Sequence, residues 1–253
     1  MRANQVIKKA AQIIKSAHNG VILTGAGVST PSGIPDFRSE DKGLWEQFDP
    51  LEFASLSAFR HNPEKFFLGL RELAKKIYYA KPNLAHFVIA QLQKLGHIRT
   101  IITQNIDGLH QTAGSHRIIE LHGTIHSLTC PRCYHKYHEE EAMIETFLET
   151  GGIPKCPKCN VILKPNMVLF EEQLPINTWL QAQEASKNCD LFIVAGSSLE
   201  ALPAAGLPMK FLENGTSLII INMCPTYLDL RAEAVLRGDV VQIMPQLLTE
   251  VLS

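Results

Sequence analysis

The chain has 253 residues and a formal net charge of −1, and its composition is 45% hydrophobic and 19% charged. This composition is typical of a globular protein with an apolar core, and the length allows one large domain or one domain with a sizeable insertion. The near-neutral charge argues against nucleic-acid binding as the main function. We therefore expect no direct nucleic-acid partner and no membrane partner.

Residues 1–20 predict a packed amphipathic helix that ends near Gly20. Its apolar side chains repeat at helical spacing and are interrupted by lysines: Val6, Ile7, Ala10, Ala11, Ile13, Ile14 and Ala17. No stretch of the chain approaches the ~20 apolar residues of a membrane helix, and no signal-peptide cleavage site follows residue 20. These features predict a cytoplasmic location.

Four nearly continuous apolar runs predict parallel strands that are buried on both faces: residues 21–24, 100–103, 191–194 and 218–221. Each run is followed by a polar or glycine-rich cluster. In open α/β sheets, ligands bind beyond the carboxyl ends of the strands. The clusters after these runs therefore predict one ligand-binding crevice.

The cysteines indicate a metal site. Cys130 and Cys133 form one C-x-x-C pair, and Cys156 and Cys159 form a second. Four thiolates at this spacing complete a tetrahedral Zn²⁺ sphere with no open position, which predicts one structural Zn²⁺ that does not activate water. A disulfide pattern is the alternative, and it is disfavoured in a cytosolic chain.

Two segments interrupt the alternation of strands and helices. Residues 37–79 hold no sheet-type run, and residues 127–163 hold the cysteine pairs, several prolines and a helix-like stretch. We predict an α/β fold: a Rossmann-like parallel-sheet domain with a smaller inserted helical and zinc-binding lobe. The predicted division gives residues 1–36, 80–126 and 164–253 to the sheet domain, and 37–79 and 127–163 to the small lobe.

The glycines after the first predicted strand are ambiguous by themselves. Gly25-Ala26-Gly27 would let a backbone approach a pyrophosphate at the start of a helix. The dinucleotide fingerprint needs a third small residue where Thr30 stands. The motif alone therefore fits either a nucleotide site or a tight turn.

A longer pattern resolves that ambiguity. Residues 25–38 read GAGVSTPSGIPDFR, and residues 103–110 read TQNIDGLH. Residues 121–123 (LHG) and 196–199 (GSSL) follow in order. Together these blocks resemble the sirtuin family, in its four-cysteine zinc form. The resemblance implies NAD⁺-dependent removal of acyl groups, acetyl in particular, from protein lysines, with release of nicotinamide and O-acyl-ADP-ribose.

The resemblance also implies the NAD⁺ contacts. Asp36, Asn105 and Asp107 would line the nicotinamide and ribose pocket, although a turn or strand-end capping role would also suit them. The implied cofactor-binding residues are Gly25, Ala26, Gly27, Thr30, Pro35, Asp36, Phe37, Arg38, Gln104, Asn105, Ile106, Asp107, Gly196, Ser197, Ser198, Asn222, Asp239 and Val240.

His122 is the candidate general base because it lies in the LHG block. An imidazole with a pKa of about 6.5 can accept a proton near neutral pH. By resemblance, His122 would deprotonate a ribose hydroxyl, with Asn105 and Asp107 as the other catalytic residues. His110 is the rival, and we expect it to pack within its loop.

The substrate contacts are also implied by resemblance. An acyl-lysine protein or peptide would bind as an added strand between residues 168–172 and 198–202, touching Val168, Phe170 and Leu199. Glu171 stands where the family usually has Gly; if φ is positive there, Glu171 must strain or reshape the loop.

Two further positions bear on the acyl group. Leu70 and Leu73 occupy the positions at which desuccinylating family members carry Tyr and Arg, which predicts a preference for neutral acyl groups.

Other functions remain as alternatives. The same fold could transfer ADP-ribose to a protein side chain. A hydride-transferring dehydrogenase would instead produce NADH, and a zinc-stabilised adaptor would turn over no NAD⁺. Nicotinamide release with an acylated peptide distinguishes these classes.

Overall fold

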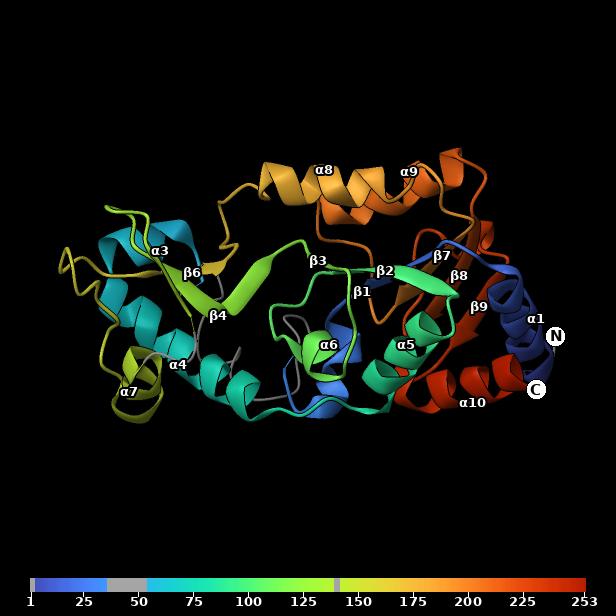
Figure 1. The fold of residues 1–253 in the computed structure, drawn as a ribbon, viewed down its shortest axis with the longest axis horizontal. Coiled ribbons are helices and arrows are strands. Elements are labelled where there is room, and N and C mark those ends of the chain that lie inside the picture. The colour runs from blue at the N-terminus through green and yellow to red at the C-terminus, as the bar shows by residue number, and fades with distance from the viewer. Residues whose placement is uncertain (1–2, 36–53, 139–141) are drawn as a thin grey trace.

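The computed structural model describes residues 3–35, 54–138 and 142–253 (Figure 1). Its larger part is built on a six-stranded sheet in the order β3-β2-β1-β7-β8-β9, with every neighbouring pair parallel. The strands are β1 (Gly20–Thr24), β2 (Ile98–Thr103), β3 (Ile118–Glu120), β7 (Leu191–Ala195), β8 (Ser217–Asn222) and β9 (Ala234–Arg237). The strand order reverses between β1 and β7, which makes their carboxyl ends the topological switch point.

The four predicted strands are confirmed, and they lie within β1, β2, β7 and β8. Alternate residues of each strand pack on opposite faces, as Ile22 does on one side and Leu23 on the other. Both faces are buried, which explains why the runs are continuously apolar. The edge strands β3 and β9 were not predicted from the sequence.

Helices cover both faces of the sheet. On one side lie α1 (Ala3–Ser16), α5 (Leu84–Lys94) and α10 (Val240–Leu252), with α1 and α10 packed together near the two termini (Figure 1). On the other lie α8 (Ile176–Glu184) and α9 (Leu207–Glu213). The chain also forms α6 (Leu109–Thr112) and the short 3₁₀ turns η3 (Ala204–Gly206) and η4 (Asp229–Arg231). This arrangement confirms the predicted Rossmann-like architecture.

The smaller lobe has its own core. It contains α3 (Leu56–His61), α4 (Pro63–Tyr79), α7 (Ala142–Thr150) and a three-stranded antiparallel sheet in the order β5-β4-β6. Those strands are β4 (Gly123–Thr129), β5 (Lys136–His138) and β6 (Lys164–Met167). Phe67 of α4 stands edge-on to Phe66 and Phe147, with ring centroids 5.1 and 5.5 Å away. The contact with Phe147 joins α4 to α7.

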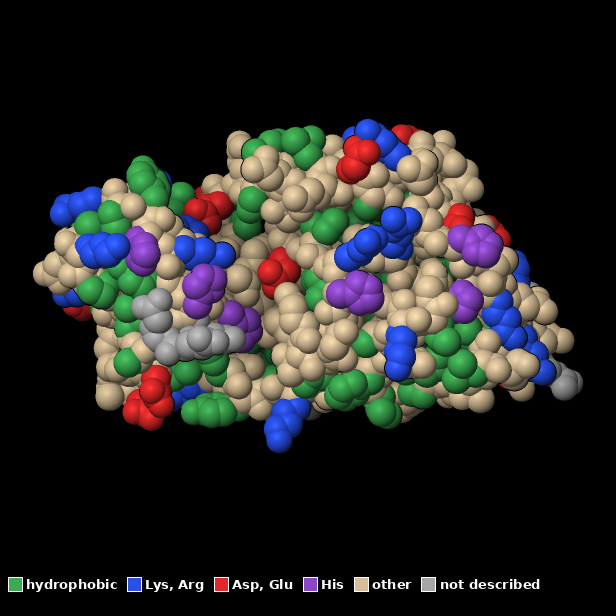
Figure 2. All heavy atoms as spheres, viewed as in Figure 1, with side chains coloured by type: hydrophobic (Ala, Val, Ile, Leu, Met, Phe, Trp, Pro, Cys, Tyr) green, Lys and Arg blue, Asp and Glu red, His purple; other side chains and the backbone are tan. Residues whose placement is uncertain are grey.

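The predicted division of the chain remains a prediction. Its boundary between residues 126 and 127 falls inside β4, a strand of the three-stranded sheet that follows β3 of the large sheet in the chain (Figure 1). Acidic and basic side chains are interspersed over the face seen in Figure 2. Among the described residues, no helix has the length and apolar character needed to cross a membrane.

Candidate active site

The loops that follow β1 and β7 meet at the switch point without side chains between them. Gly25 N–H donates to the Ala195 carbonyl at 3.1 Å, and Gly27 N–H donates to the Gly196 carbonyl at 2.9 Å. A Cβ atom on Gly27 would lie 2.9 Å from the Gly196 Cα, and one on Gly196 would lie 2.5 Å from the Val28 nitrogen. Such contacts are too close, so both positions require glycine. The glycines therefore let the ends of β1 and β7 pack in direct backbone contact.

Asn105 and Asp107 are held in one hydrogen-bonded network. The Asn105 amide donates to the Gly25 carbonyl at 3.1 Å and to the Ser29 hydroxyl at 3.0 Å. Ser29 in turn donates to the Asp107 carboxylate at 2.6 Å, and Leu109 N–H donates to its other oxygen at 2.9 Å. Asp107 and Ser29 are both buried. The strand-end residues are thus fixed before any ligand binds.

Ser29 links the loops after β1 and β2, although it was not among the site residues predicted from the sequence. It lies between the turns η1 (Ala26–Val28) and η2 (Thr30–Ser32). The available signal was its position inside the GAGVST block, between the predicted cofactor residues Gly27 and Thr30.

A second layer of polar groups lies beneath this network. Thr24 donates its hydroxyl hydrogen to Thr103 at 2.9 Å, and Thr103 accepts from Asn105 N–H at 3.1 Å. His110 Nε2 lies 2.9 Å from the Thr24 hydroxyl. Burial lowers the pKa of His110 to about 3 and that of the neighbouring His86 to about 4. Both imidazoles are therefore neutral near pH 7, and His110 is packed within the fold.

His122 has a defined tautomer. Its Nδ1 lies 2.9 Å from the Gln104 carbonyl, which can only accept a hydrogen bond. In the neutral ring Nδ1 therefore carries the proton, and Nε2 is left as the basic nitrogen. Burial lowers the pKa of His122, and the bond to Gln104 opposes that shift. Nε2 can thus accept a proton at neutral pH.

The remaining predicted cofactor residues lie on the segments that follow the carboxyl ends of the strands. Gln104 donates its side-chain N–H to Ser197 at 3.1 Å, which connects the β2 and β7 loops. Ala26, Thr30, Pro35, Ile106 and Ser198 lie on these strand-end segments. Asp36, Phe37 and Arg38 lie outside the described residues. Ligand contacts by all of these residues stay predictions.

The three predicted cofactor residues nearest the C-terminus, Asn222, Asp239 and Val240, have structural roles in the fold. Asn222, at the end of β8, donates its amide to the Cys224 carbonyl at 2.9 Å. Asp239 caps α10 by accepting from Val241 N–H at 3.0 Å, and Val240 is buried in the core. The Asp239 side chain therefore serves to start a helix.

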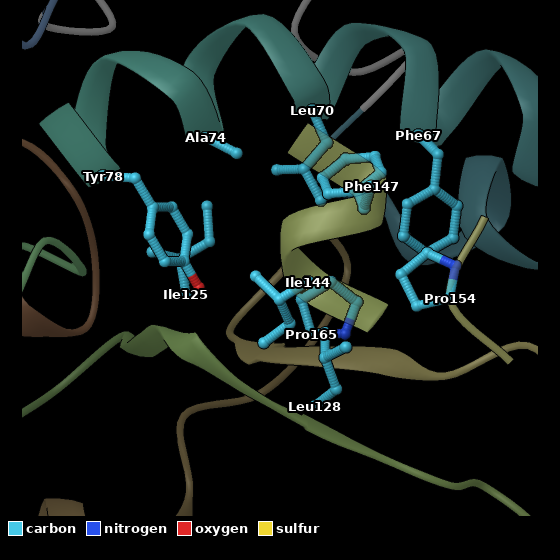
Figure 3. Close-up of a pocket in the computed structure, with 10 residues that line it drawn as sticks. All are labelled: Phe67, Leu70, Ala74, Tyr78, Ile125, Leu128, Ile144, Phe147, Pro154 and Pro165. Carbon is cyan, nitrogen blue, oxygen red and sulfur yellow. The ribbon is translucent and has the colours of Figure 1, made fainter. Parts of the chain in front are cut away.

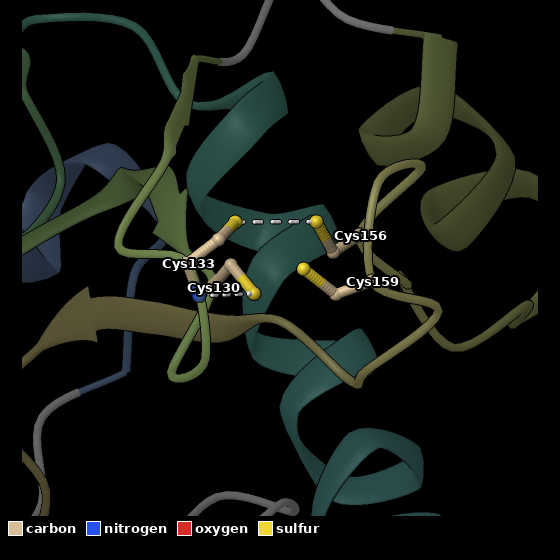
Figure 4. A group of neighbouring side chains, drawn as sticks. All are labelled: Cys130, Cys133, Cys156 and Cys159. Atoms are coloured by element: carbon tan, nitrogen blue, oxygen red, sulfur yellow. Dashed lines mark hydrogen bonds between the residues drawn. The ribbon is translucent and has the colours of Figure 1, made fainter.

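The four predicted zinc ligands converge in the small lobe (Figure 4). The sulfurs of Cys130, Cys133, Cys156 and Cys159 all lie within 4.8 Å of one another. The Cys133 and Cys156 sulfurs are 3.7 Å apart, close to the roughly 3.8 Å edge of a tetrahedron with Zn–S bonds of ~2.3 Å. The donor set fits Zn²⁺, and it leaves no position for a reactive water. Tyr137, which is buried, lies with its hydroxyl 3.2 Å from the Cys156 sulfur.

Comparisons with known proteins agree with this geometry. A model of the Sir2 family matches residues 25–203, from the Gly25 turn to beyond the β7 loop. The chain belongs to the Sir2 family. This result confirms the sirtuin resemblance, and the cysteine cluster confirms its four-cysteine form.

Curated Sir2 relatives match over nearly their whole length. The NAD-dependent protein deacylase 2 of Archaeoglobus fulgidus is 44% identical over 246 residues, covering 97% of this chain and 96% of the relative. The NAD-dependent protein deacetylase of Caldivirga maquilingensis is 43% identical, covering 96% and 93%.

Solved Sir2 structures share the fold. One, from work on the mechanism and regulation of Sir2 enzymes, superposes with a TM-score of 0.90 at 43% identity, covering 98% of both chains. Another holds a deacetylated p53 peptide and 3′-O-acetyl-ADP-ribose; it has a TM-score of 0.88 at 38% identity and covers 96% of this chain and 98% of its own.

The predicted substrate loop of this Sir2 chain is attached to both lobes. Val168 N–H donates to the His122 carbonyl at 2.8 Å, and Phe170 forms a parallel bridge with Ser55 in the small lobe. The Phe170 side chain is 42% exposed. Glu171 has φ +73°, the left-handed conformation that Gly adopts without strain, so the loop keeps a turn that suits Gly. Leu199, on the other predicted loop, is buried with φ +57°.

Leu70 and Leu73 lie on the buried face of α4. Leu70 lines an apolar cavity in the small lobe between α4, α7, β4 and β6 (Figure 3). Its walls are Phe67, Leu70, Ala74, Tyr78, Ile125, Leu128, Ile144, Phe147, Pro154 and Pro165. Leu73 is 4% exposed and belongs to the same core. Their place at an acyl pocket stays a prediction.

We expect Cys156→Ala to lose stoichiometric zinc and to loosen the small lobe, because ligand binding and folding are coupled in such sites. Elemental analysis should show the loss of metal, and Tm should fall by roughly 5–10 °C. Cys224→Ala, which removes an exposed thiol outside the cluster, is the matched control. Retention of one zinc per chain by the Cys156 variant, or absence of metal from the native protein, would contradict the zinc assignment.

Proposed function

We propose that this Sir2 chain is an NAD⁺-dependent protein-lysine deacylase that removes neutral acyl groups, acetyl in particular. The observation that carries the proposal is the fixed tautomer of His122 beside the Asn105–Ser29–Asp107 network. The curated relatives named as NAD-dependent deacylases and deacetylases support it, as does a solved Sir2 structure bound to acetylated peptide. The products are the deacylated lysine, nicotinamide and O-acyl-ADP-ribose.

The strand-end loops fit a dinucleotide. Gly25, Gly27 and Gly196 bring the β1 and β7 loops into direct backbone contact at the switch point, and polar side chains of Gln104, Asn105 and Ser197 lie beside that contact. When bound there, NAD⁺ supplies the ADP-ribose acceptor and the nicotinamide leaving group. The residues proposed to hold it are those on the described strand-end loops, together with Asp36, Phe37 and Arg38.

Asn105 and Asp107 act as fixed polar groups. Loss of neutral nicotinamide leaves positive charge developing on the ribose, and a carboxylate held in place stabilises such charge without reorganising. Asp107 is held by Ser29 and by Leu109 N–H, so its orientation is set in advance. Asn105 is held in the same way by Gly25 and Ser29.

His122 accepts a proton through Nε2. With NAD⁺ and an acyl-lysine bound, His122 would take the proton from a ribose hydroxyl and so make that oxygen able to accept the acyl group. The Gln104 carbonyl stabilises the imidazolium that results, because Nδ1–H continues to donate to it. The base therefore does not need to rotate during the reaction.

The acyl-lysine peptide is proposed to bind as an added strand between residues 168–172 and 198–202. Val168 joins this loop to the main chain of His122, and Phe170 presents an exposed ring. A lysine extended across this loop would therefore approach the proposed base.

Incubation with NAD⁺ and an acetyl-lysine peptide, followed by mass spectrometry, tests the function directly. Deacetylated peptide, nicotinamide and O-acetyl-ADP-ribose in equal amounts are expected. ADP-ribosylated protein without deacetylation would instead identify an ADP-ribosyltransferase. NADH formation would identify a dehydrogenase, and no turnover would favour a non-enzymatic role.

His122→Ala should lower kcat/KM for deacetylation about 10²–10⁴-fold, the usual contribution of a general base. The fold and the zinc content should not change, because the cysteines are on a different part of the chain. His116→Ala, which removes an exposed imidazole, should leave activity near native. Near-native turnover by the His122 variant would remove this residue from the mechanism.

The pH dependence should report the buried base. His122 is active when neutral, and burial lowers its pKa below 6.5. Activity should therefore persist as the pH falls to 6.5 and decline only at lower pH. The measurement is kcat/KM between pH 5 and pH 8 at constant ionic strength. A decline in kcat/KM that already begins above pH 7 as the pH is lowered would conflict with a buried, neutral imidazole as the base.

The enzyme should prefer acetyl-lysine over succinyl-lysine by at least about 100-fold in kcat/KM. A carboxylate near Leu70 and Leu73 would lose water without gaining a partner, at a cost of several kcal/mol. Leu70→Tyr with Leu73→Arg should shift preference towards succinyl-lysine, whereas Leu70→Phe with Leu73→Met should not. Because both leucines are buried, Tm is measured on each variant. Equal succinyl turnover by the native enzyme would show that these leucines do not select the acyl group.

A further inference from the structure

Glu171 connects the proposed substrate loop to a helix of the small lobe. One of its carboxylate oxygens accepts two hydrogen bonds from Ser57, from the backbone N–H at 2.9 Å and from the hydroxyl at 2.7 Å. These bonds lower the pKa of Glu171, and Arg60 and His61 on the same helix act in the same direction. The carboxylate is thus ionised at neutral pH and directed at α3.

The backbone of Glu171 is unfavourable for its residue type. Its φ of +73° lies in the left-handed region, where a Cβ atom meets the backbone. A residue with a side chain persists there when its surroundings fix it. The two hydrogen bonds with Ser57 hold Glu171 in this conformation. The turn at residue 171 and the contact with α3 therefore both depend on the Glu171 side chain.

The neighbouring residues extend the attachment. Phe170 N–H donates to the Ala54 carbonyl at 3.0 Å, and Leu56 N–H donates to the Phe170 carbonyl at 3.1 Å. On the other side, Glu172 accepts from Leu169 N–H at 2.9 Å and pairs with Lys164 at 2.9 Å. The exposed ring of Phe170 therefore lies on a segment fixed at both ends.

We propose that Glu171 is a positioning residue for peptide binding: its bonds to Ser57 hold the loop of residues 168–172 in the conformation that receives the acyl-lysine peptide. The proposal rests on the deacylase function proposed above. A loop that is ordered before binding loses less conformational freedom when the peptide binds, and affinity rises accordingly. Glu171 acts through Phe170 and the loop backbone, and it takes no part in the chemistry.

The first test measures the attachment without any substrate. Hydrogen exchange followed by mass spectrometry on the native protein and on Glu171→Ala should show faster exchange in residues 54–61 of the variant, because Ser57 N–H loses its acceptor. Glu213→Ala removes an exposed carboxylate on α9 and is the matched control. Unchanged exchange in the Glu171 variant would overturn the proposal.

The second test separates peptide binding from NAD⁺ binding. Glu171→Ala should raise KM for the acetyl-peptide roughly threefold to tenfold, with KM for NAD⁺ and kcat close to native. Glu171→Gly also loses the attachment but relieves the positive φ, so its KM should rise less. Glu171→Gln keeps an acceptor oxygen and should lie nearest the native value.

A double-mutant cycle completes the design. Ser57→Ala should raise peptide KM modestly, and adding it to Glu171→Ala should cause no further rise, because the two residues share one contact. A native-like peptide KM for Glu171→Ala would overturn the proposal, and so would additive effects of the two substitutions. Turnover by the native protein would still support the deacylase function in either case. If the native protein neither binds nor deacylates the peptide, the proposed function is refuted instead. Hydrogen exchange would then still show whether Glu171 holds the loop to α3.

Discussion

The site depends on the close contact between the β1 and β7 loops. Gly27 and Gly196 meet at a distance that leaves no room for a Cβ atom on either residue. This contact is set at the switch point of the sheet, where two adjacent parallel strands diverge into different loops. Asn105 then bonds to Gly25, and Gln104 bonds to Ser197, so the β2 loop takes its position from both. A side chain at either glycine would displace all three loops together.

Burial determines the protonation state of the site. His86 and His110 lie beneath the strand-end network, and desolvation keeps both neutral. An imidazolium there would face no fully compensating partner, since Asp107 is already occupied by Ser29 and Leu109. Asp107 is the acidic residue of this network, and its fixed orientation suits a site where positive charge must develop on a bound sugar. His122 is less buried than His86 and His110, and its bond to the Gln104 carbonyl leaves Nε2 as the basic nitrogen.

The central features could be predicted from the sequence because they have local signatures. Continuous apolar runs identified β1, β2, β7 and β8, and C-x-x-C spacing identified the metal ligands. The edge strands β3 and β9 are short and half-covered, so they lack such a run. Ser29 and the partners of Glu171 depend on contacts between residues far apart in the chain. Spacing could place Leu70 and Leu73 on one helix face, but only the fold shows that this face is the core of the small lobe.

A continuous set of hydrogen bonds runs from the large sheet to the small lobe through His122. Its imidazole is bonded to Gln104 at the end of β2, and its carbonyl accepts from Val168. Two residues further on, Phe170 bonds to Ala54 and Leu56, beside the helix that Glu171 holds. The orientation of the proposed base and that of the substrate loop are therefore linked. A shift of the small lobe would therefore be transmitted through residues 168–170 to the main chain of His122. This linkage explains why a contact far from the reacting atoms, such as Glu171 with Ser57, bears on the geometry of the site.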